Sequence, residues 1–136
     1  MILVDTNILM YAAGADHPNK RPSTEFLERV ASDRIQAAID TEALQEILHR
    51  YLALGRGAEG RQVYDGARRL FAVPLPATVE VMDRARGFLD QHPQIGARDA
   101  MHAAIVVEHG LSGICSYDRG FDTLSSVLRF EPDELE

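Results

Sequence analysis

Four acidic residues stand where a short apolar segment ends or where a helix begins. Asp5 directly follows the first apolar run of the chain, ILV, and Asp118 directly follows the apolar stretch GICSY. Glu46 lies one turn into a predicted helix, and Asp99 lies in the first turn of another. The ends of parallel strands and the first turns of the helices that follow them share one edge of a sheet. We therefore expect these four carboxylates to meet in one place.

Carboxylates gathered at one point favour a divalent cation. Mg²⁺ is a hard ion that takes oxygen ligands and keeps several waters, so two or three carboxylates are enough to hold it. Without a cation, like-charged carboxylates within a few ångströms repel and raise one another's pKa. A water activated by Mg²⁺ or Mn²⁺ can attack a phosphodiester, and no Ser, Cys or His nucleophile is then needed.

Each acid also has a purely structural interpretation. Asp5 suits a turn or an N-cap that closes a strand and opens a helix. An acid in the first turn of a helix, such as Asp99, complements the helix dipole. Glu46 is predicted opposite the apolar stripe of its helix and could be solvated, and Asp118 could form a turn with Gly120. These interpretations do not explain why four acids fall at one edge.

Composition describes one ordinary domain. The chain has 136 residues, of which 46% are hydrophobic and 26% charged. No apolar run approaches the roughly 18 residues of a membrane span, and no signal peptide is visible at the N-terminus. The single cysteine, Cys115, excludes an intrachain disulfide and fits a cytoplasmic protein and a buried apolar role. The net charge of −7 argues against nucleic-acid binding unless the acids hold a cation that attracts phosphate.

Apolar spacing predicts short strands that alternate with amphipathic helices. Strands are expected at Ile2–Val4, Arg34–Ile39, Phe71–Leu75 (an edge strand, because it contains Pro74), Gly113–Tyr117 and Val127–Phe130. Helices are expected at Pro22–Ala31 with Ser23 as a cap, Thr41–Leu54, Glu59–Leu70, Thr78–Asp90 and Ala97–His109. We predict one α/β domain over residues 1–136, with a largely parallel sheet flanked by helices. The closing FEPDELE is expected to be a frayed acidic tail.

The segments VDTNIL, ARDAMHAA and SYDRGF, with an acid near residue 46, together resemble the PIN-domain family. Within that family the chain looks like the VapC toxins of bacterial type II toxin–antitoxin modules, over essentially its whole length. The resemblance implies a metal-dependent endoribonuclease with one or two Mg²⁺ or Mn²⁺ ions. Asp5, Glu46, Asp99 and Asp118 match the four acidic positions of the family. Asp5 and Asp99 are the acids most expected to be direct ligands.

The resemblance also assigns the polar neighbours of these acids. Thr6 and Asn7 match the pair that follows the first acid, and they are expected to orient it or to bind phosphate of the substrate. Ser116 stands where the family usually has Thr and is a weaker candidate for a substrate contact. The expected partners are RNA, a cognate antitoxin protein and a second copy of the chain in a homodimer, with no membrane.

Spacing leaves two of the acidic positions open. Glu42, one turn earlier in the same helix, could take the place of Glu46, and Asp122 could take the place of Asp118. His102 is expected at the surface of its helix next to Asp99, either solvated or in contact with substrate or water.

The same residues allow other classes of protein. Glu46 and His49 form an E-x-x-H motif, and Asp99 and His102 form a near copy, which is typical of di-iron four-helix bundles. The alternating strands argue against that fold. A haloacid-dehalogenase-like phosphatase would need a second acid two residues after Asp5, where this chain has Asn7. A PIN-like scaffold that only binds or regulates remains an alternative to a catalyst.

A relatively basic region is predicted around residues 50–69. It contains Arg50, Arg56, Arg61, Arg68 and Arg69. These side chains could guide an RNA backbone toward the acids, pair with an acidic part of an antitoxin, or form an ordinary solvated surface.

Overall fold

The computed structural model describes residues 1–136 and contains one four-stranded, wholly parallel sheet in the order β2-β1-β3-β4. The strands are β1 (Ile2–Val4), β2 (Ala37–Ala38), β3 (Gly113–Cys115) and β4 (Arg129–Phe130). β1 is central, and its Ile2 aligns with Ala37 on one side and with Gly113 on the other. The predicted α/β class with a parallel sheet is confirmed.

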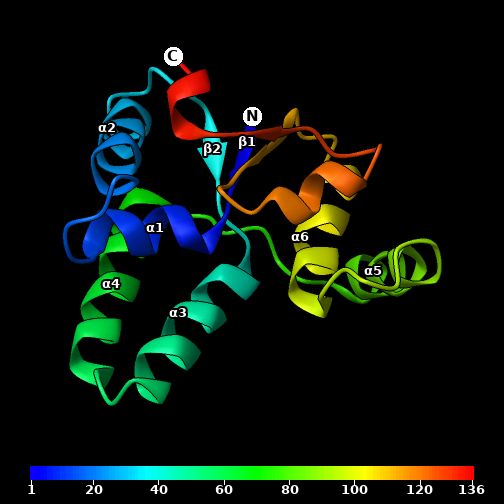
Figure 1. Cartoon of the computed structure of the whole chain (residues 1–136), viewed down its shortest axis with the longest axis horizontal. Helices are drawn as coiled ribbons and strands as arrows, with labels where there is room; N and C mark the ends of the chain where they lie inside the picture. Colours follow the sequence, from blue (N-terminus) through cyan, green and yellow to red (C-terminus); the bar gives the residue numbers. More distant parts are fainter.

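Six α-helices cover the two faces of this sheet (Figure 1). They are α1 (Thr6–Ala13), α2 (Lys20–Ala31), α3 (Thr41–Ala53), α4 (Gly57–Leu70), α5 (Val79–Gln91) and α6 (Ala97–Glu108). Two short 3-10 helices follow, η1 (Arg119–Thr123) and η2 (Pro132–Glu134). None of the helices is both long and apolar enough to cross a membrane.

The alternation of side chains along β1 divides the core into two parts. Ile2 and Val4 belong to the larger cluster, which includes residues of α1, α2, α3 and α4. Leu3 points to the opposite face and belongs to the second cluster, with residues of α5 and α6. Because successive side chains of a strand face opposite sides, a three-residue strand suffices to join both layers. The acidic end of β1 therefore lies between the two layers of helices.

Helix α3 forms as its apolar spacing predicts. Leu44, Ile47 and Tyr51 are buried on one face. The helix ends in a Schellman motif: the Arg56 amide donates to the Tyr51 carbonyl at 2.8 Å and the Gly55 amide to the Leu52 carbonyl at 3.0 Å. Gly55 has φ of 70°, a conformation that glycine adopts without steric cost. This sharp stop turns the chain directly into α4.

Several expected elements are shorter or different. The strand expected at Arg34–Ile39 is limited to Ala37–Ala38, and Phe71–Leu75 forms no strand, only a single bridge between Asp40 and Leu75. Ser23 lies inside α2 and is buried, whereas Asn19 occupies the N-cap position. The core does not need longer strands, because more than half of the buried hydrophobic residues lie in the α-helices.

The end of the chain is ordered, in contrast to the frayed tail expected from FEPDELE. Pro132–Glu134 form η2, and Pro132 is buried. Arg29 of α2 donates to the carbonyl of Pro132 at 3.1 Å. A buried proline ring and this charge-assisted hydrogen bond attach the tail to α2.

Candidate active site

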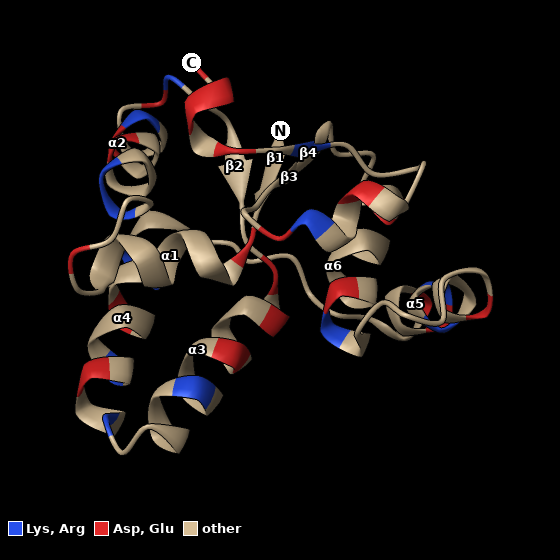
Figure 2. Cartoon of the chain, viewed as in Figure 1, with Lys and Arg blue, Asp and Glu red and all other residues tan.

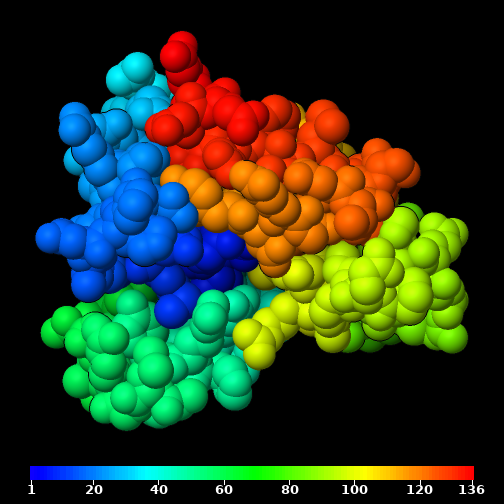
Figure 3. Space-filling model, viewed as in Figure 1, coloured from blue at the N-terminus to red at the C-terminus, as the bar shows by residue number.

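The four predicted acids line one cleft of about 450 Å³ at the carboxyl ends of β1 and β3. Figure 2 shows acidic segments around this point, and in Figure 3 α3 (teal) and the start of α6 (yellow) flank it. Its lining consists of Asp5, Asn7, Glu46, Arg50, Gly96, Ala97, Arg98, Asp99 and Asp118. Four acids that are up to 113 positions apart in the chain (118 − 5) thus meet as expected from the position of strand ends.

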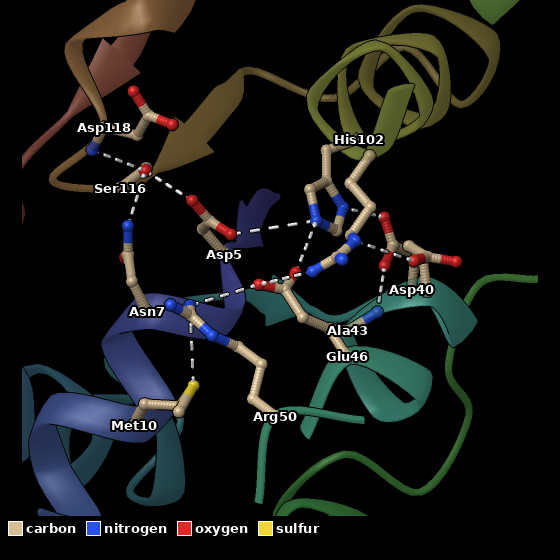
Figure 4. A network of polar contacts seen from close by, with 12 residues as sticks. Asp5, Asn7, Met10, Asp40, Ala43, Glu46, Arg50, His102, Ser116 and Asp118 are labelled. Carbon is tan, nitrogen blue, oxygen red and sulfur yellow. Dashed lines mark hydrogen bonds and ion pairs between the residues drawn. The ribbon is translucent and has the colours of Figure 1, made fainter. Parts of the chain in front are cut away.

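Asp5 occupies the N-cap position of α1 but does not use its side chain as a cap. Its backbone is extended, its amide donates to the Cys115 carbonyl at 3.0 Å, and its side chain makes no hydrogen bond to the helix amides. The carboxylate instead contacts Ser116 and His102 (Figure 4). The side chain is buried, so the structural interpretation of Asp5 as a simple cap does not account for it.

Ser116 connects three residues around Asp5. Its hydroxyl donates to Oδ2 of Asp5 at 2.5 Å and accepts hydrogen bonds from Nδ2 of Asn7 at 3.2 Å and from the amide of Asp118 at 2.9 Å. Ser116 is fully buried, and so is Thr6. A direct contact of either residue with RNA therefore conflicts with their burial. Ser116 orients Asp5, whereas Asn7 lines the cleft.

Asp118 has two roles at the end of β3. Its Oδ1 accepts a hydrogen bond from the Gly120 amide at 2.8 Å, which is the turn that the sequence SYDRG allowed. The same side chain lines the cleft. Asp122, the open alternative, is held by Arg129 at 2.9 Å and is absent from the lining. The geometry therefore favours Asp118 over Asp122.

Glu46 lies between two arginines and a histidine. Its Oε2 is 3.4 Å from Nη1 of Arg50 and 3.5 Å from Nη1 of Arg98, and its Oε1 is 4.0 Å from Nε2 of His102. The Glu46 side chain is only 12% exposed, so it is not the solvated residue that its place opposite the apolar stripe suggested. Glu42, the alternative acid, contacts Arg98 at 3.9 Å but does not line the cleft.

His102 lies inside the protein, and the expectation of a surface histidine is wrong. Its side chain is 1% exposed, with Nδ1 2.5 Å from Oδ2 of Asp40 and Nε2 3.7 Å from Oδ1 of Asp5. Asp40 is itself the N-cap of α3, where its Oδ1 accepts from the Ala43 amide at 2.9 Å. His102 thus connects the start of α3 to the end of β1 (Figure 4).

The electrostatics of the cleft follow from burial and charge. Burial, then the carboxylates of Asp118 and Asp5, raise the pKa of Asp99 to about 7. Burial also raises the pKa of Asp5, although the charge of His102 opposes this. For His102, burial by itself lowers the pKa, but Asp40 and the neighbouring acids outweigh it and raise the pKa well above its usual range. These shifts are typical of functional sites.

Three side chains of this group lie close enough together to hold a metal ion. Single ligand atoms of Asp5, Glu46 and His102 all lie within 4.8 Å of one another. Nε2 of His102 and Oδ1 of Asn7 are buried and have no hydrogen-bond partner. Unpaired buried polar atoms are uncommon in folded proteins, and Nε2 of His102 faces two acids, Oδ1 of Asp5 at 3.7 Å and Oε1 of Glu46 at 4.0 Å.

Three contributors to the site were not predicted. Asp40 lies two residues after the end of β2 and directly after the strand expected at Arg34–Ile39, so the position of an acid after a strand was the signal that could have found it. Arg98 precedes Asp99 in the first turn of α6, and nothing in the local sequence distinguishes it from other exposed arginines. The burial of His102 has a signal as well: the small residues Ala100, Ala103 and Ala104 surround it in sequence and are all fully buried.

Comparison with known proteins agrees with this geometry. A family model described as "PIN domain" matches residues 2–126. A VapC ribonuclease of Mycobacterium bovis is 37% identical over 129 residues, covering 95% of this chain and 98% of that protein. Ribonuclease VapC23 of Mycobacterium tuberculosis is 36% identical over 129 residues, covering 95% and 99%.

Solved structures share the fold. FitAcB of Neisseria gonorrhoeae has a TM-score of 0.74 at 22% identity, covering 99% of this chain and 100% of that one. VapBC2 of Rickettsia felis, solved with a DNA fragment of its promoter, has a TM-score of 0.76 at 17% identity, covering 96% and 98%.

The chain has a parallel sheet with four acids at its edge, and the family model matches most of its length. These features define a PIN domain. The chain belongs to the PIN-domain family and, within it, to the VapC ribonucleases.

Proposed function

We propose that the chain is a metal-dependent endoribonuclease that acts as the toxin of a type II toxin–antitoxin system. Its catalytic centre would be Asp5, Glu46, Asp99 and Asp118. The observation that carries this proposal is their convergence: acids from four separate segments line one cleft, and the kinship with VapC ribonucleases gives the reaction class.

The donor set fits Mg²⁺ or Mn²⁺. The acids supply oxygen ligands, which hard divalent cations prefer. The raised pKa of Asp99 reflects its burial first and then the repulsion of the neighbouring carboxylates of Asp118 and Asp5. When bound, the cation supplies Lewis-acid chemistry, because it lowers the pKa of water and neutralises charge on phosphate.

The residues of the chain position the reactants. Ser116 fixes one oxygen of Asp5 and His102 faces the other, so that the carboxylate has one defined orientation toward the cleft. Hydrolysis adds a water oxygen to phosphorus and breaks one P–O ester bond, and the water proton is transferred to the leaving oxygen. Preorganised groups of this kind lower the barrier because they need no rearrangement during the reaction.

The partners follow from the relatives. We infer a cognate antitoxin, because relatives of the same fold are toxin–antitoxin proteins, and a cytoplasmic location in which the single thiol of Cys115 stays reduced. A homodimer is supported by large apolar side chains that stay exposed, notably Val79 and Met82 of α5, which are 71% and 45% exposed.

Cleavage of a structured RNA tests the catalytic proposal. Purified protein should cut the RNA with Mg²⁺ or Mn²⁺ and not with EDTA, and Asp5→Asn and Asp99→Asn should each lower the rate at least 100-fold. Asp122→Asn is the matched control, an acid outside the cleft, and it should cut like wild type. If wild type and all variants behave alike, the assignment of the catalytic site is wrong, and the result supports the alternative of a non-catalytic PIN-like scaffold.

A further inference from the structure

A second hollow lies beside the acidic cleft and shares part of its wall. It has a volume of about 500 Å³ and is lined by Met10, Glu46, His49, Arg50, Ala53, Leu54 and Arg98. Glu46, Arg50 and Arg98 line both spaces. The two hollows are therefore neighbours on one surface, separated by a wall of one acid and two arginines.

The two arginines are the only basic residues in the lining of the acidic cleft. Both contact the same oxygen of Glu46 through Nη1, at 3.4 Å for Arg50 and 3.5 Å for Arg98. Each guanidinium has five N–H donors, and Nη2 of each has no partner in the chain. Their side chains are 51% and 43% exposed, so these donors are open to a ligand.

The rest of the hollow differs from the acidic cleft. Met10, Ala53 and Leu54 give it an apolar wall, and Leu54 is 62% exposed. His49, the histidine of the E-x-x-H motif, lies here and not among the acids. An imidazole and an apolar wall suit the flat face of a nucleobase, and such contacts tolerate any base.

We propose that this hollow binds the ribonucleotide next to the scissile phosphate. Arg50 and Arg98 contact the phosphate of that nucleotide, and the apolar wall packs against its base. The proposal rests on the ribonuclease site above and deepens it by naming where the RNA strand leaves the acidic cleft. A chain with a net charge of −7 needs local cations to hold RNA, and these arginines provide them at the cleft. The size is within the roughly 300–1,000 Å³ of small-ligand sites.

The structure also distinguishes Arg50 from the other arginines of the predicted basic region. Arg61, Arg68 and Arg69 lie exposed on α4 and line neither hollow. Arg56 pairs with Glu59. Of the five arginines of that region, only Arg50 is placed to contact RNA at the cleft.

Kinetics and binding test the proposal together. Arg50→Ala and Arg98→Ala are compared with Arg21→Ala, which removes another exposed helical arginine from an i, i+4 pair with an acid. The two cleft variants should each lower kcat/KM for RNA about tenfold, mostly through a higher KM, whereas Arg21→Ala should match wild type. Arg50→Lys should recover part of the loss, because it keeps the charge and loses the planar fork.

Binding is measured separately in an Asp99→Asn background, by fluorescence anisotropy of a short labelled single-stranded RNA of mixed sequence with Mg²⁺. The slope of log K against log salt is negative. Each arginine removed should make it less steep by about 0.7, the value of one lost phosphate contact on a single strand. Leu54→Ser should weaken binding about two- to threefold without changing the slope.

Failure of this subsite and failure of the catalytic proposal are distinguishable. If Arg50→Ala and Arg98→Ala behave like Arg21→Ala in both assays, or lose affinity with no change in salt slope, the subsite is wrong while metal-dependent cleavage stands. If Asp99→Asn cuts RNA like wild type, the catalytic proposal is wrong, and the binding slopes still report on the hollow.

Discussion

Nδ1 of His102 lies 2.5 Å from Oδ2 of Asp40, and each of these side chains is 1% exposed. The pair joins α6 to the first turn of α3, and the second nitrogen of the imidazole faces Asp5 and Glu46. A buried charged pair is costly to break, because removal of one partner leaves the other uncompensated. The position of two of the four acids therefore depends on a contact that is outside the cleft lining.

Removal of His102 tests this dependence. We expect His102→Ala to lower the free energy of unfolding by about 3–5 kcal/mol, since Asp40 then stays buried without its partner. Urea denaturation measures the change. The double variant His102→Ala/Asp40→Asn should cost less than the sum of the two single variants by about 1–3 kcal/mol. Additive costs would show that the two side chains are not coupled.

Ser116 provides a second test of how Asp5 is held. Ser116→Ala removes a hydroxyl that makes three hydrogen bonds, with Asp5, Asn7 and the Asp118 amide. We expect Mn²⁺ affinity to fall about 10- to 100-fold, the usual effect of losing a group that orients a ligand. Calorimetric titration measures it. Ser116→Thr keeps the hydroxyl and should retain affinity; equal loss in both variants would mean that packing, and not the hydroxyl, matters.

The stability of the metal-free protein should depend on Asp99. Its pKa is about 7 in the folded chain against an ordinary value of 3.8, so the folded state binds the proton more tightly than the unfolded state. The stabilisation that comes from the bound proton is complete below about pH 4 and is lost as pH rises to about 7, because the half-buried carboxylate must then ionise beside Asp118.

Denaturation in EDTA at pH 5 and pH 8 measures this effect. Wild type should lose on the order of 1 kcal/mol more than Asp99→Asn between the two pH values, after allowance for solvent screening. Mn²⁺ should remove the difference for wild type at pH 8. Identical pH profiles for wild type and Asp99→Asn would contradict the assigned origin of the shift.

Close packing of α3 on α4 predicts a stability change away from the cleft. A Cβ on Gly60 would lie 2.5 Å from Cβ of Tyr51, whereas a Cβ on Gly66 would have only Arg69 Nη2 nearby, at 3.7 Å. We expect Gly60→Ala to destabilise the chain by about 1–3 kcal/mol and Gly66→Ala to be neutral or to stabilise it by up to about 1 kcal/mol. Thermal denaturation compares them, and an equal effect of both would show that α4 adjusts freely.

The sequence predicts most of the fold because its helices carry a clear apolar period. Thr41–Leu54 and Ala97–His109 were expected within one residue of α3 and α6. The ends of the strands are harder to predict from the sequence. Strands of two or three residues that are buried on both faces show no alternation of polar and apolar residues to mark where they end. The strand expected at Phe71–Leu75 does not form. These five residues have a strand-like composition, but only Leu75 pairs, in a single bridge with Asp40.

The site was predicted through the acids but not through what holds them. Strand ends placed Asp5 and Asp118, and the convergence with Glu46 and Asp99 followed from a parallel sheet. The bond between His102 and Asp40 joins residues 62 positions apart, and no local pattern records such a contact. The pairing of Arg50 and Arg98 on one oxygen of Glu46 is likewise a product of how α3 meets α6.

Direct measurement of Mn²⁺ binding by electron paramagnetic resonance tests the central claim, that the converged carboxylates hold a catalytic cation. Wild type and the control Asp122→Asn should both reduce the signal of free Mn²⁺, with similar affinity. Asp5→Asn and Asp99→Asn should bind at least tenfold more weakly. Equal binding by all four proteins, or no binding by wild type, would contradict the assignment of this cleft as the metal centre.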